Sequence, residues 1–522
     1  MEPLPGQCDV LIVGAGPTGL MLANQLARHG VDALLIDRHA GPARETRALG
    51  VQARTMEIYA RLGLMGRALE LGQRALGANL WSRGRRTARI PLGDIGRDLS
   101  PYPFLLILGQ DDNERLLGDA LRSHGRDVHW NSELVGLEQH ADHVVTQVRG
   151  PSGATAVVRA RWVAGCDGAR SAVRDLNGIG FPGAPYEHVF FVADTTATGP
   201  MVRDEINVFL LSQGFHLFFP MRGKDHWRLV GILPPALRGR DDLTFDDVIP
   251  TLSEQAVKGL AFSECRWFST YRIHHRRAER FRDRRCFLLG DAAHIHSPVG
   301  AQGMNTGLQD AYNLGWKLAL VLSGGAREAL LDTFAAERMP VAERLLQTTD
   351  RAFAFVVSDH WLSRLPRTRV LARIPAIAMR FGAARELAFR TISQTGIRYP
   401  DSPLSQREAG LSADSPQPGD RFPWMKLVFA SGAPAQDLYA RLDDTRFNLI
   451  LVGQAKGVGP VDGAIVVHEI PELASNGTVL ARAGIRKPSY YLLRPDGHIG
   501  LAGTELNDGD VQRYFAEHIA AS

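Results

Sequence analysis

The sequence predicts an α/β fold with two or three domains, and three observations lead to this prediction. The first is a glycine-rich turn between a strand and a helix near the start of the chain. The second is a run of strands over residues 186–273, and the third is the return of alternating strands and helices after residue 286. With 522 residues, the chain is too long for a single hydrophobic core.

The glycine-rich turn has the form of a dinucleotide-binding site. An apolar strand at residues 10–13 leads into Gly14-Ala15-Gly16-Pro17-Thr18-Gly19, and residues 18–29 have helical periodicity. The first glycine allows the bend, the second lets a pyrophosphate approach the backbone, and the third lets the helix pack on the strand. Asp37 follows a second strand at residues 33–36 and lies 18 residues after Gly19, where it can accept hydrogen bonds from a ribose. An ordinary tight turn is the alternative.

The pattern of elements predicts the domain limits. Residues 1–180 and 270–398 alternate strands and helices, which is typical of a doubly wound domain. Residues 181–269 predict an inserted antiparallel sheet, which part of residues 76–105 is expected to join. Residues 399–420 are rich in Pro, Gly and Ser and predict a linker, and residues 421–522 predict a small separate α/β domain.

Composition excludes several classes of protein. The formal net charge of +4 gives no reason to expect a nucleic-acid partner. The four cysteines have no CxxC or metal-like spacing, so we expect free thiols, no metal site and a reducing, cytoplasmic location. No secretion signal is visible and no apolar run is long enough to span a membrane, so we expect no stable membrane insertion.

Two further turns follow predicted strands. Cys166-Asp167-Gly168 ends one strand, and Gly290-Asp291 ends the strand at residues 286–289. After the second turn come Pro298 and Gly300, and a long helix is predicted at residues 303–322. Each turn alone could be structural.

In this order and spacing, the three turns resemble those of the FAD-dependent aromatic hydroxylases, single-component flavoprotein monooxygenases related to para-hydroxybenzoate hydroxylase and phenol hydroxylase. The resemblance covers nearly the whole chain, includes Arg47, Arg54 and Gln110, and is most specific over residues 290–318. It implies a Rossmann-like FAD-binding domain of the glutathione-reductase type, an inserted β-sheet substrate domain and a C-terminal thioredoxin-like domain. Because no cysteine follows Cys286, we expect the last domain to be redox-inactive and structural, as a packing or dimer surface.

The resemblance also implies roles for individual residues, with FAD bound non-covalently. The glycine turn would hold the pyrophosphate, Asp37 the adenosine ribose, and Asp291 the ribityl or ribose hydroxyls, while Asp167 would serve both FAD and NAD(P)H. The helix that begins after Gly300 would direct its N–H groups at the flavin, with Pro298 as a rigid wall beside the ring. The residues expected to contact FAD are Gly14, Gly16, Gly19, Asp37, Arg38, Arg47, Gln110, Asp167, Gly290, Asp291, Pro298, Gly300, Gly303, Met304 and Asn305.

The reaction implied is hydroxylation of a phenolic or polycyclic aromatic ring. NAD(P)H, bound transiently, reduces FAD, and O₂ then forms a flavin C4a-hydroperoxide that transfers its distal oxygen to the substrate. Beside Pro298, the candidate catalytic residues are His216 as a base and Arg222 as a partner for a phenolate, although a packing histidine and a surface arginine are the commoner roles. The side chains expected to line the substrate are Phe209, Leu211, Phe218 and Trp227.

Other functions explain less of the sequence. A plain NAD-dependent dehydrogenase would account for the first turn but not for residues 290–318. The Trp-x-Trp-x-Ile-Pro motif of flavin-dependent halogenases is absent, as is a Baeyer-Villiger-type histidine motif. A non-catalytic flavin-binding or scaffold protein, or a flavin-dependent oxidoreductase of another type, stays open. So do the identity of the substrate, the choice of NADH or NADPH and the formation of a homodimer.

Overall fold

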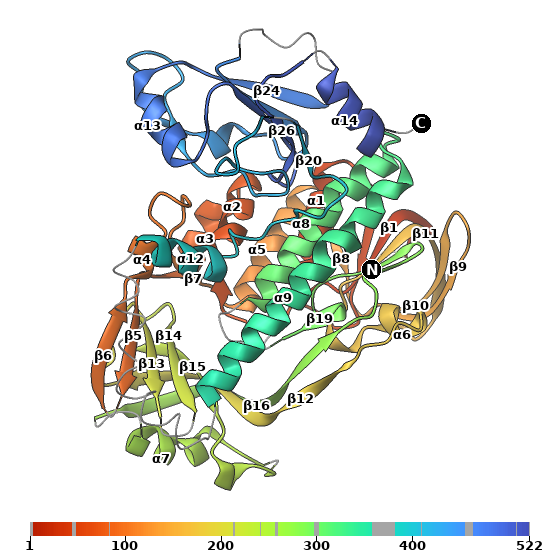
Figure 1. The fold of residues 1–522 in the computed structure, drawn as a ribbon. Helices are drawn as coiled ribbons and strands as arrows, with labels where there is room; N and C mark the ends of the chain where they lie inside the picture. Colours follow the sequence, from red (N-terminus) through yellow and green to blue (C-terminus); the bar gives the residue numbers. More distant parts are fainter. Residues whose placement is uncertain are drawn as a thin grey trace.

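The fold is mixed α/β with several sheets, as the sequence predicts (Figure 1). We describe it from a computed structural model of the chain. The described residues are 4–43, 48–82, 84–211, 214–240, 242–255, 259–296, 302–357, 382–408, 410–454, 463–507 and 509–520. Arg47, Pro298 and Gly300 lie outside them, as does most of the arginine-rich stretch of residues 361–398. Among these residues, no helix combines the length and apolar character that crossing a bilayer requires.

The first sheet is parallel at its centre, where β18, β11, β1, β2 and β8 lie side by side. The central strands β1, β2 and β18 are mostly apolar and buried, as expected where helices cover both faces. Its eight strands are β1 (Gln7–Val13), β2 (Ala33–Ile36), β8 (Val128–His129), β9 (Glu133–Gln139), β10 (Val144–Arg149), β11 (Thr155–Gly165), β17 (Arg282–Asp283) and β18 (Cys286–Leu288).

Helix α8 (Gly303–Leu322) is the central helix of this part of the molecule. It packs against α1 (Pro17–Arg28), and its side chains are buried almost without interruption from Asn305 to Ala319. The neighbouring helix α9 (Asp332–Val357) runs diagonally across the front of the molecule (Figure 1). The remaining helices are α2 (Ala53–Arg61), α3 (Met65–Leu71), α4 (Leu92–Ile95), α5 (Gln110–Ser123), α6 (Ala172–Leu176) and α12 (Gly382–Ile392). A small sheet adds β3 (Gly50–Val51), β4 (Gln73–Ala75) and β7 (Leu105–Ile107).

The second sheet has the order β19-β16-β12-β15-β14-β13-β5-β6. All of its pairs are antiparallel except β13 with β5, which is parallel. Most of it comes from the chain between β11 and β18, and α7 (Phe245–Gln255) packs on it (Figure 1). Its strands are β5 (Ala78–Ser82), β6 (Arg85–Ile90), β12 (Gly183–Thr198), β13 (Ile206–Leu210), β14 (Phe215–Pro220), β15 (His226–Ile232), β16 (Ala261–Arg277) and β19 (His294–Ile295).

A five-stranded sheet with helices α13 (Ala474–Arg482) and α14 (Asp510–His518), here called the C-terminal unit, forms the top of Figure 1. The strand order is β20-β26-β25-β23-β24, with β23 and β24 parallel. One apolar cluster joins Trp316 of α8 to Phe447 and Tyr490 of this unit, so the packing is continuous between them. The strands are β20 (Gln406–Arg407), β23 (Phe447–Val452), β24 (Ile465–Ile470), β25 (Ser489–Leu493) and β26 (Ile499–Gly503), and β21 (Lys426–Leu427) pairs with β22 (Gln436–Asp437) beside them. Short 3₁₀ turns occur at Gly168–Arg170, Pro235–Leu237, Gly290–Ala292, Glu328–Leu331 and Leu438–Arg441.

Candidate cofactor and substrate site

The three turns predicted from the sequence lie against one another. A Cβ atom at Gly14, whose φ is +103°, would lie 2.4 Å from the carbonyl oxygen of Cys166 in the second turn. A Cβ at Gly290, whose φ is +57°, would lie 2.7 Å from Oγ1 of Thr18 in the first turn. Only glycine allows both the left-handed backbone and these approaches. Segments far apart in the sequence therefore meet at the start of α1.

The three glycines of the first turn differ in what surrounds them. A Cβ at Gly19 would lie 1.9 Å from the carbonyl oxygen of Gly14, so Gly19 is required for packing. A Cβ at Gly16 would meet no heavy atom within 4 Å among the described residues. Gly16 is also the N-cap of α1 and has an ordinary φ of −70°. The N–H groups at the start of α1, where the helix dipole is positive, therefore face open space that suits a phosphate.

A cavity of about 730 Å³ lies beside this turn. Gly14, Gly16, Asp37, Arg38, Gln110 and Asp167, all predicted from the sequence, line it. Sequence reasoning missed seven other polar or aromatic residues of the lining, which are His39, Glu114, Arg115, Trp130, Ser132, Glu133 and Arg170. Trp130 follows β8, a strand of two residues that has no sequence signature and is defined by its pairing with β2.

Asp37 holds the end of β2 next to the glycine turn. Its Oδ2 accepts a hydrogen bond from the Ala15 N–H at 2.7 Å, and its Oδ1 accepts one from the His39 N–H at 2.8 Å. The His39 ring nitrogen Nδ1 also lies 2.8 Å from Oδ1. The carboxylate is therefore fixed at the edge of the cavity and keeps lone pairs for a ribose hydroxyl.

Asp167 has one carboxylate oxygen without a protein partner. Oδ2 accepts a hydrogen bond from the Val173 N–H at 3.2 Å, whereas Oδ1 is buried and has no hydrogen-bond partner among the described residues. Burial raises the pKa of this carboxyl, although hydrogen bonds from Ser171 and from backbone N–H groups oppose the rise. A buried acceptor of this kind at a cavity wall is suited to a hydroxyl donor from a ligand.

Gln110 and Glu114 line the same cavity as this acid. The Gln110 amide Nε2 donates to Glu114 Oε1 at 2.8 Å, and Glu114 Oε2 accepts from the Ala43 N–H at 2.8 Å. Burial raises the pKa of Glu114. Because the amide is held by Glu114, its carbonyl and its second N–H are available to the cavity.

The Gly290-Asp291 turn presents its acid outward. Gly290 and Ala292 are buried, whereas Asp291 is exposed, and the Gly290 N–H donates to Oδ2 of Asp310 at 3.0 Å. Close by, Asn305 ties the first turn of α8 to β3, because its Oδ1 accepts from the Gln52 N–H at 2.9 Å and its Nδ2 donates to the Gly50 carbonyl at 2.7 Å.

Gly303 and Met304 at the start of α8 are half-buried, and the thioether of Met304 accepts a hydrogen bond from Asn113 Nδ2 at 3.3 Å.

The set of donors and acceptors at the three turns and the cavity fits FAD. It offers bare N–H groups to a pyrophosphate and carboxylates to ribose hydroxyls.

The two faces of the second sheet are both apolar. On one face Phe191, Phe209 and Trp227 pack under α7 against Phe245, Val248 and Leu252. On the other face lie Phe190 and Val192 with the half-buried Leu217, Phe219, Trp267 and Tyr271. Phe219 of this second face also packs with Leu49 and Ile107, beside β3. The second face therefore points toward the start of α8.

That Phe209, Leu211, Phe218 and Trp227 line the substrate stays a prediction that their position does not support. All four are buried in the cluster beneath α7, on the face that points away from β3. Period-two alternation identifies the residues that share a face, but it does not say which face meets the cofactor.

His216 lies on the same face, with its ring 5.6 Å from that of Phe191. Both ring nitrogens are buried without a hydrogen-bond partner among the described residues, and burial lowers the pKa of His216 to about 4. This environment is that of a neutral packing residue. The role of His216 as a base stays a prediction that its position does not support.

Arg222 is exposed in the turn after β14. Its guanidinium NH1 donates to the carbonyl of Glu70 at 2.9 Å and so links this turn to the end of α3. A role toward a phenolate stays a prediction, as do the roles of Pro298, Gly300 and Arg47, which lie outside the described residues. Within the described ranges, no group of three or more His, Cys, Asp and Glu side chains is arranged to hold a metal ion.

Comparison with known proteins agrees with this geometry. Residues 7–349 match the model of the FAD binding domain family. The chain is 33% identical to 6-methylpretetramide 4-monooxygenase from Streptomyces rimosus, with 96% of this chain and 92% of the relative covered. It is 32% identical to pentachlorophenol 4-monooxygenase from Sphingobium chlorophenolicum, with 86% of this chain and 81% of the relative covered.

Among solved structures, OxyS anhydrotetracycline hydroxylase from Streptomyces rimosus superposes with a TM-score of 0.75 at 29% identity, over 98% of this chain and 99% of that chain. The chain belongs to the FAD binding domain family and is an FAD-dependent aromatic monooxygenase.

Proposed function

We propose that this monooxygenase hydroxylates a polycyclic, phenol-bearing aromatic molecule, and that the convergence of its three turns forms the FAD site. That convergence is the observation that carries the assignment, because the turns are far apart in the sequence and meet around the start of α1. The pyrophosphate would lie at Gly16 and the adenosine near Asp37, Arg38 and Trp130. Asp167 and Gln110, which line the cavity, would form hydrogen bonds with the remaining hydroxyls, and the exposed Asp291 would accept a further one.

The same proposal divides the chain into functional parts. Residues 1–180 and 270–398 would form a Rossmann-like FAD-binding domain of the glutathione-reductase type, with the second sheet, residues 181–269 and part of 76–105, as the substrate domain. The strand order and helices of residues 421–522 support a thioredoxin-like domain without CxxC, joined by a linker at residues 399–420.

The substrate would lie against the second face of the second sheet, the face that carries Phe190 and Val192. Leu217, Phe219, Trp267 and Tyr271 are half-buried there, and they offer an apolar surface wider than one aromatic ring. Relatives include enzymes named for a pretetramide and an anhydrotetracycline, which are polycyclic, and this likeness favours a substrate of that size.

When bound, FAD supplies the electron and oxygen chemistry, with NAD(P)H as donor and O₂ as the oxygen source. The protein must orient the aromatic ring and exclude water from it. On the proposed substrate face, Asp194 accepts a 2.5 Å ion-pair contact from Arg228, which lies over Trp267. The buried carboxylate pairs with the guanidinium and also contacts Nε2 of His226, so these groups add fixed polarity to an otherwise apolar face without leaving a charge unpaired.

A single substitution tests the cofactor site. In Gly16→Ala the new methyl group meets no protein atom, but it would occupy the space assigned to the pyrophosphate. We expect the free energy of unfolding of the apoprotein to change by no more than about 1 kcal/mol, since glycine and alanine differ modestly at an N-cap. FAD affinity, measured by quenching of flavin fluorescence, should fall at least tenfold. Gly6→Ala is the matched control and should bind FAD normally, because Gly6 is exposed and a Cβ there would also meet no atom within 4 Å.

The reaction is tested with the unsubstituted protein and FAD. NAD(P)H oxidation should accelerate when a polycyclic phenol is added, with one hydroxylated product formed per NAD(P)H consumed, and a single-ring phenol should give less product and more hydrogen peroxide. Product formation limited to single-ring phenols would overturn the proposed substrate size. No stimulation by any phenol would favour a non-catalytic flavin-binding protein.

A further inference from the structure

A buried chain of polar contacts runs from the Gly290-Asp291 turn to the C-terminal unit. It begins at Asp310 of α8, whose Oδ2 accepts from the Gly290 N–H at 3.0 Å and lies 2.8 Å from His294 Nε2. The side chains of Asp310 and His294 are each about 1% exposed. Asp310 therefore fixes both ends of the turn that carries Asp291.

Arg338 of α9 is the second member of the chain. Its Nε donates to Asp310 Oδ1 at 2.6 Å, and its NH2 donates to the Thr306 carbonyl in the first turn of α8 at 3.2 Å. Burial alone would raise the pKa of Asp310, but the charges of Arg338 and His294 lower it. Asp310 is thus held as a carboxylate, the form that can accept from the Gly290 N–H.

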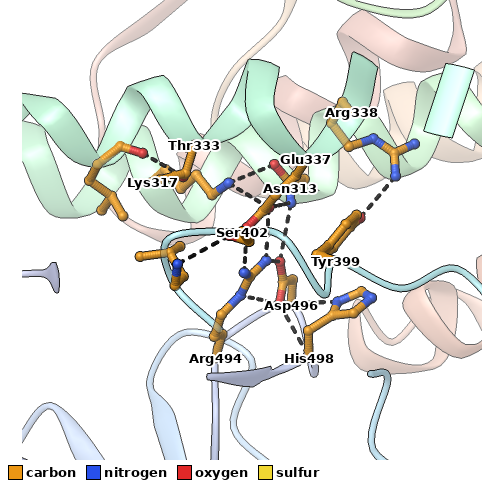
Figure 2. A network of polar contacts seen from close by, with 12 residues as sticks. Asn313, Lys317, Thr333, Glu337, Arg338, Tyr399, Ser402, Arg494, Asp496 and His498 are labelled. Atoms are coloured by element: carbon orange, nitrogen blue, oxygen red, sulfur yellow. Dashed lines mark hydrogen bonds and ion pairs between the residues drawn. The ribbon is translucent and has the colours of Figure 1, made fainter. Parts of the chain in front are cut away.

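Tyr399 connects Arg338 to the C-terminal unit, as Figure 2 shows. Its hydroxyl accepts a hydrogen bond from Arg338 NH1 at 2.9 Å. Its ring lies 4.4 Å from the ring of His498, and the Arg494 guanidinium lies 5.4 Å from its centre. His498 and Arg494 flank the turn between β25 and β26, and both also contact Asp496. The position of the Tyr399 hydroxyl therefore depends on how the C-terminal unit docks.

We propose that Arg338 and Asp310 are positioning residues for the cofactor, and that the C-terminal unit sets FAD affinity through Tyr399. The inference rests on the proposed assignment of Asp291 to the FAD site. The carboxylate of Asp310 is held by Arg338 and His294. It therefore keeps Gly290 in its left-handed conformation against Thr18, so that Asp291 is presented in one orientation. If Tyr399 moves, Arg338 loses a partner and the turn gains freedom that FAD binding must then remove.

The test compares FAD affinity and apoprotein stability in the full chain. Tyr399→Phe removes one hydrogen bond to a buried charge, and we expect the FAD dissociation constant to rise about tenfold. Arg338→Lys keeps the charge but not the planar fork, and should weaken FAD binding further. Affinity is measured by flavin fluorescence, and the resolution of the visible absorption bands of bound flavin reports how rigidly it is held.

Arg28→Gln is the matched control. Arg28 forms a two-hydrogen-bond ion pair with Asp444 of the C-terminal unit, at 2.7 and 2.9 Å, from the opposite end of α1. This variant should lose apoprotein stability yet bind FAD as the unsubstituted protein does. Equal weakening in Arg28→Gln and Tyr399→Phe would overturn the proposal, because the effect would then reflect docking in general.

A final variant separates this inference from the site assignment. Asp291→Ala should weaken FAD binding on its own. If it does, while Tyr399→Phe binds FAD normally, the coupling is wrong and the site stands. If Asp291→Ala binds FAD normally, the assignment of the turn fails and the inference fails with it. Should Arg338→Lys not fold, Tyr399→Phe decides the result.

Discussion

At the scale of single residues, glycines were easier to predict than aromatic side chains. The roles of Gly14 and Gly19 follow from backbone geometry that only glycine satisfies, so the motif alone was sufficient. Strand β14, in contrast, reads Phe-His-Leu-Phe-Phe-Pro, with apolar side chains on both faces. Because α7 covers one face and the other packs beside β3, alternation of polar and apolar residues is lost. The pattern of β14 therefore does not say which face of the sheet carries His216 and Phe218.

His216 should make the stability of the protein depend on pH. Its pKa is about 4 in the fold because of burial, against 6.5 for an exposed histidine. Between these values the unfolded chain binds a proton that the folded chain does not. The free energy of unfolding therefore keeps its full value above pH 6.5. As the pH falls toward 4, this group lowers it by about 3 kcal/mol.

When the free energy of unfolding in urea is measured between pH 4 and pH 6.5, it should depend less steeply on pH in His216→Phe. The difference should correspond to at most one proton taken up on unfolding. An unchanged slope would show that His216 is solvated, and a loss of hydroxylation without a loss of FAD would restore its role as a base.

At the scale of elements, the long helix α8 and the short apolar strand β18 were predictable, whereas strands of two residues were not. Helix α8 was predicted at residues 303–322 and is observed there, because its apolar period persists over twenty residues. Strands β3 and β8 have two residues each and exist only through pairing with other segments. The sequence had no local signal for them, and Trp130 at the cavity was missed for that reason.

The start of α8 should depend on the amide of Asn305. This side chain makes one hydrogen bond as acceptor to Gln52 and one as donor to Gly50, both buried. Asn305→Ala should lower the free energy of unfolding by about 2 kcal/mol, measured in urea. Asn305→Asp has nearly the same shape but places a second oxygen against the Gly50 carbonyl, so it should destabilise at least as much. An Asp variant as stable as the unsubstituted protein would contradict this account of the contact.

At the scale of the whole molecule, the segment predicted as a linker is part of the packed interior. Tyr399 is 5% exposed and Leu404 1% exposed, and Ser402 donates to Glu337 of α9 at 2.6 Å. Proline, glycine and serine predict an irregular backbone, but they do not say whether that backbone is buried. The packing partners of residues 399–420 come from α8, α9 and the C-terminal unit, and only the assembled fold brings these together.

Glu337 should be a main electrostatic contact between helices α8 and α9 and the C-terminal unit. It is fully buried and bonds Arg494 at 2.6 and 3.0 Å and Lys317 at 2.8 Å (Figure 2). Although burial opposes it, these two cations lower the pKa of Glu337, and burial lowers the pKa of Lys317 to about 8. Glu337→Ala would leave an excess positive charge in the interior, and we expect a loss of about 3–5 kcal/mol in the free energy of unfolding.

Charge balance distinguishes this account from a simple loss of packing. Lys317 and Arg494 face Glu337 and Asp496, so removing Lys317 together with Glu337 restores neutrality. The double variant Glu337→Ala with Lys317→Met should therefore be more stable than Glu337→Ala alone, as urea unfolding would measure. Glu70→Ala, which breaks an ion pair whose side chains are 62% and 65% exposed, should cause no measurable change. If the double variant is less stable than the single one, the buried cation is not the source of the loss, and the parts are held together by apolar contacts such as those of Trp316.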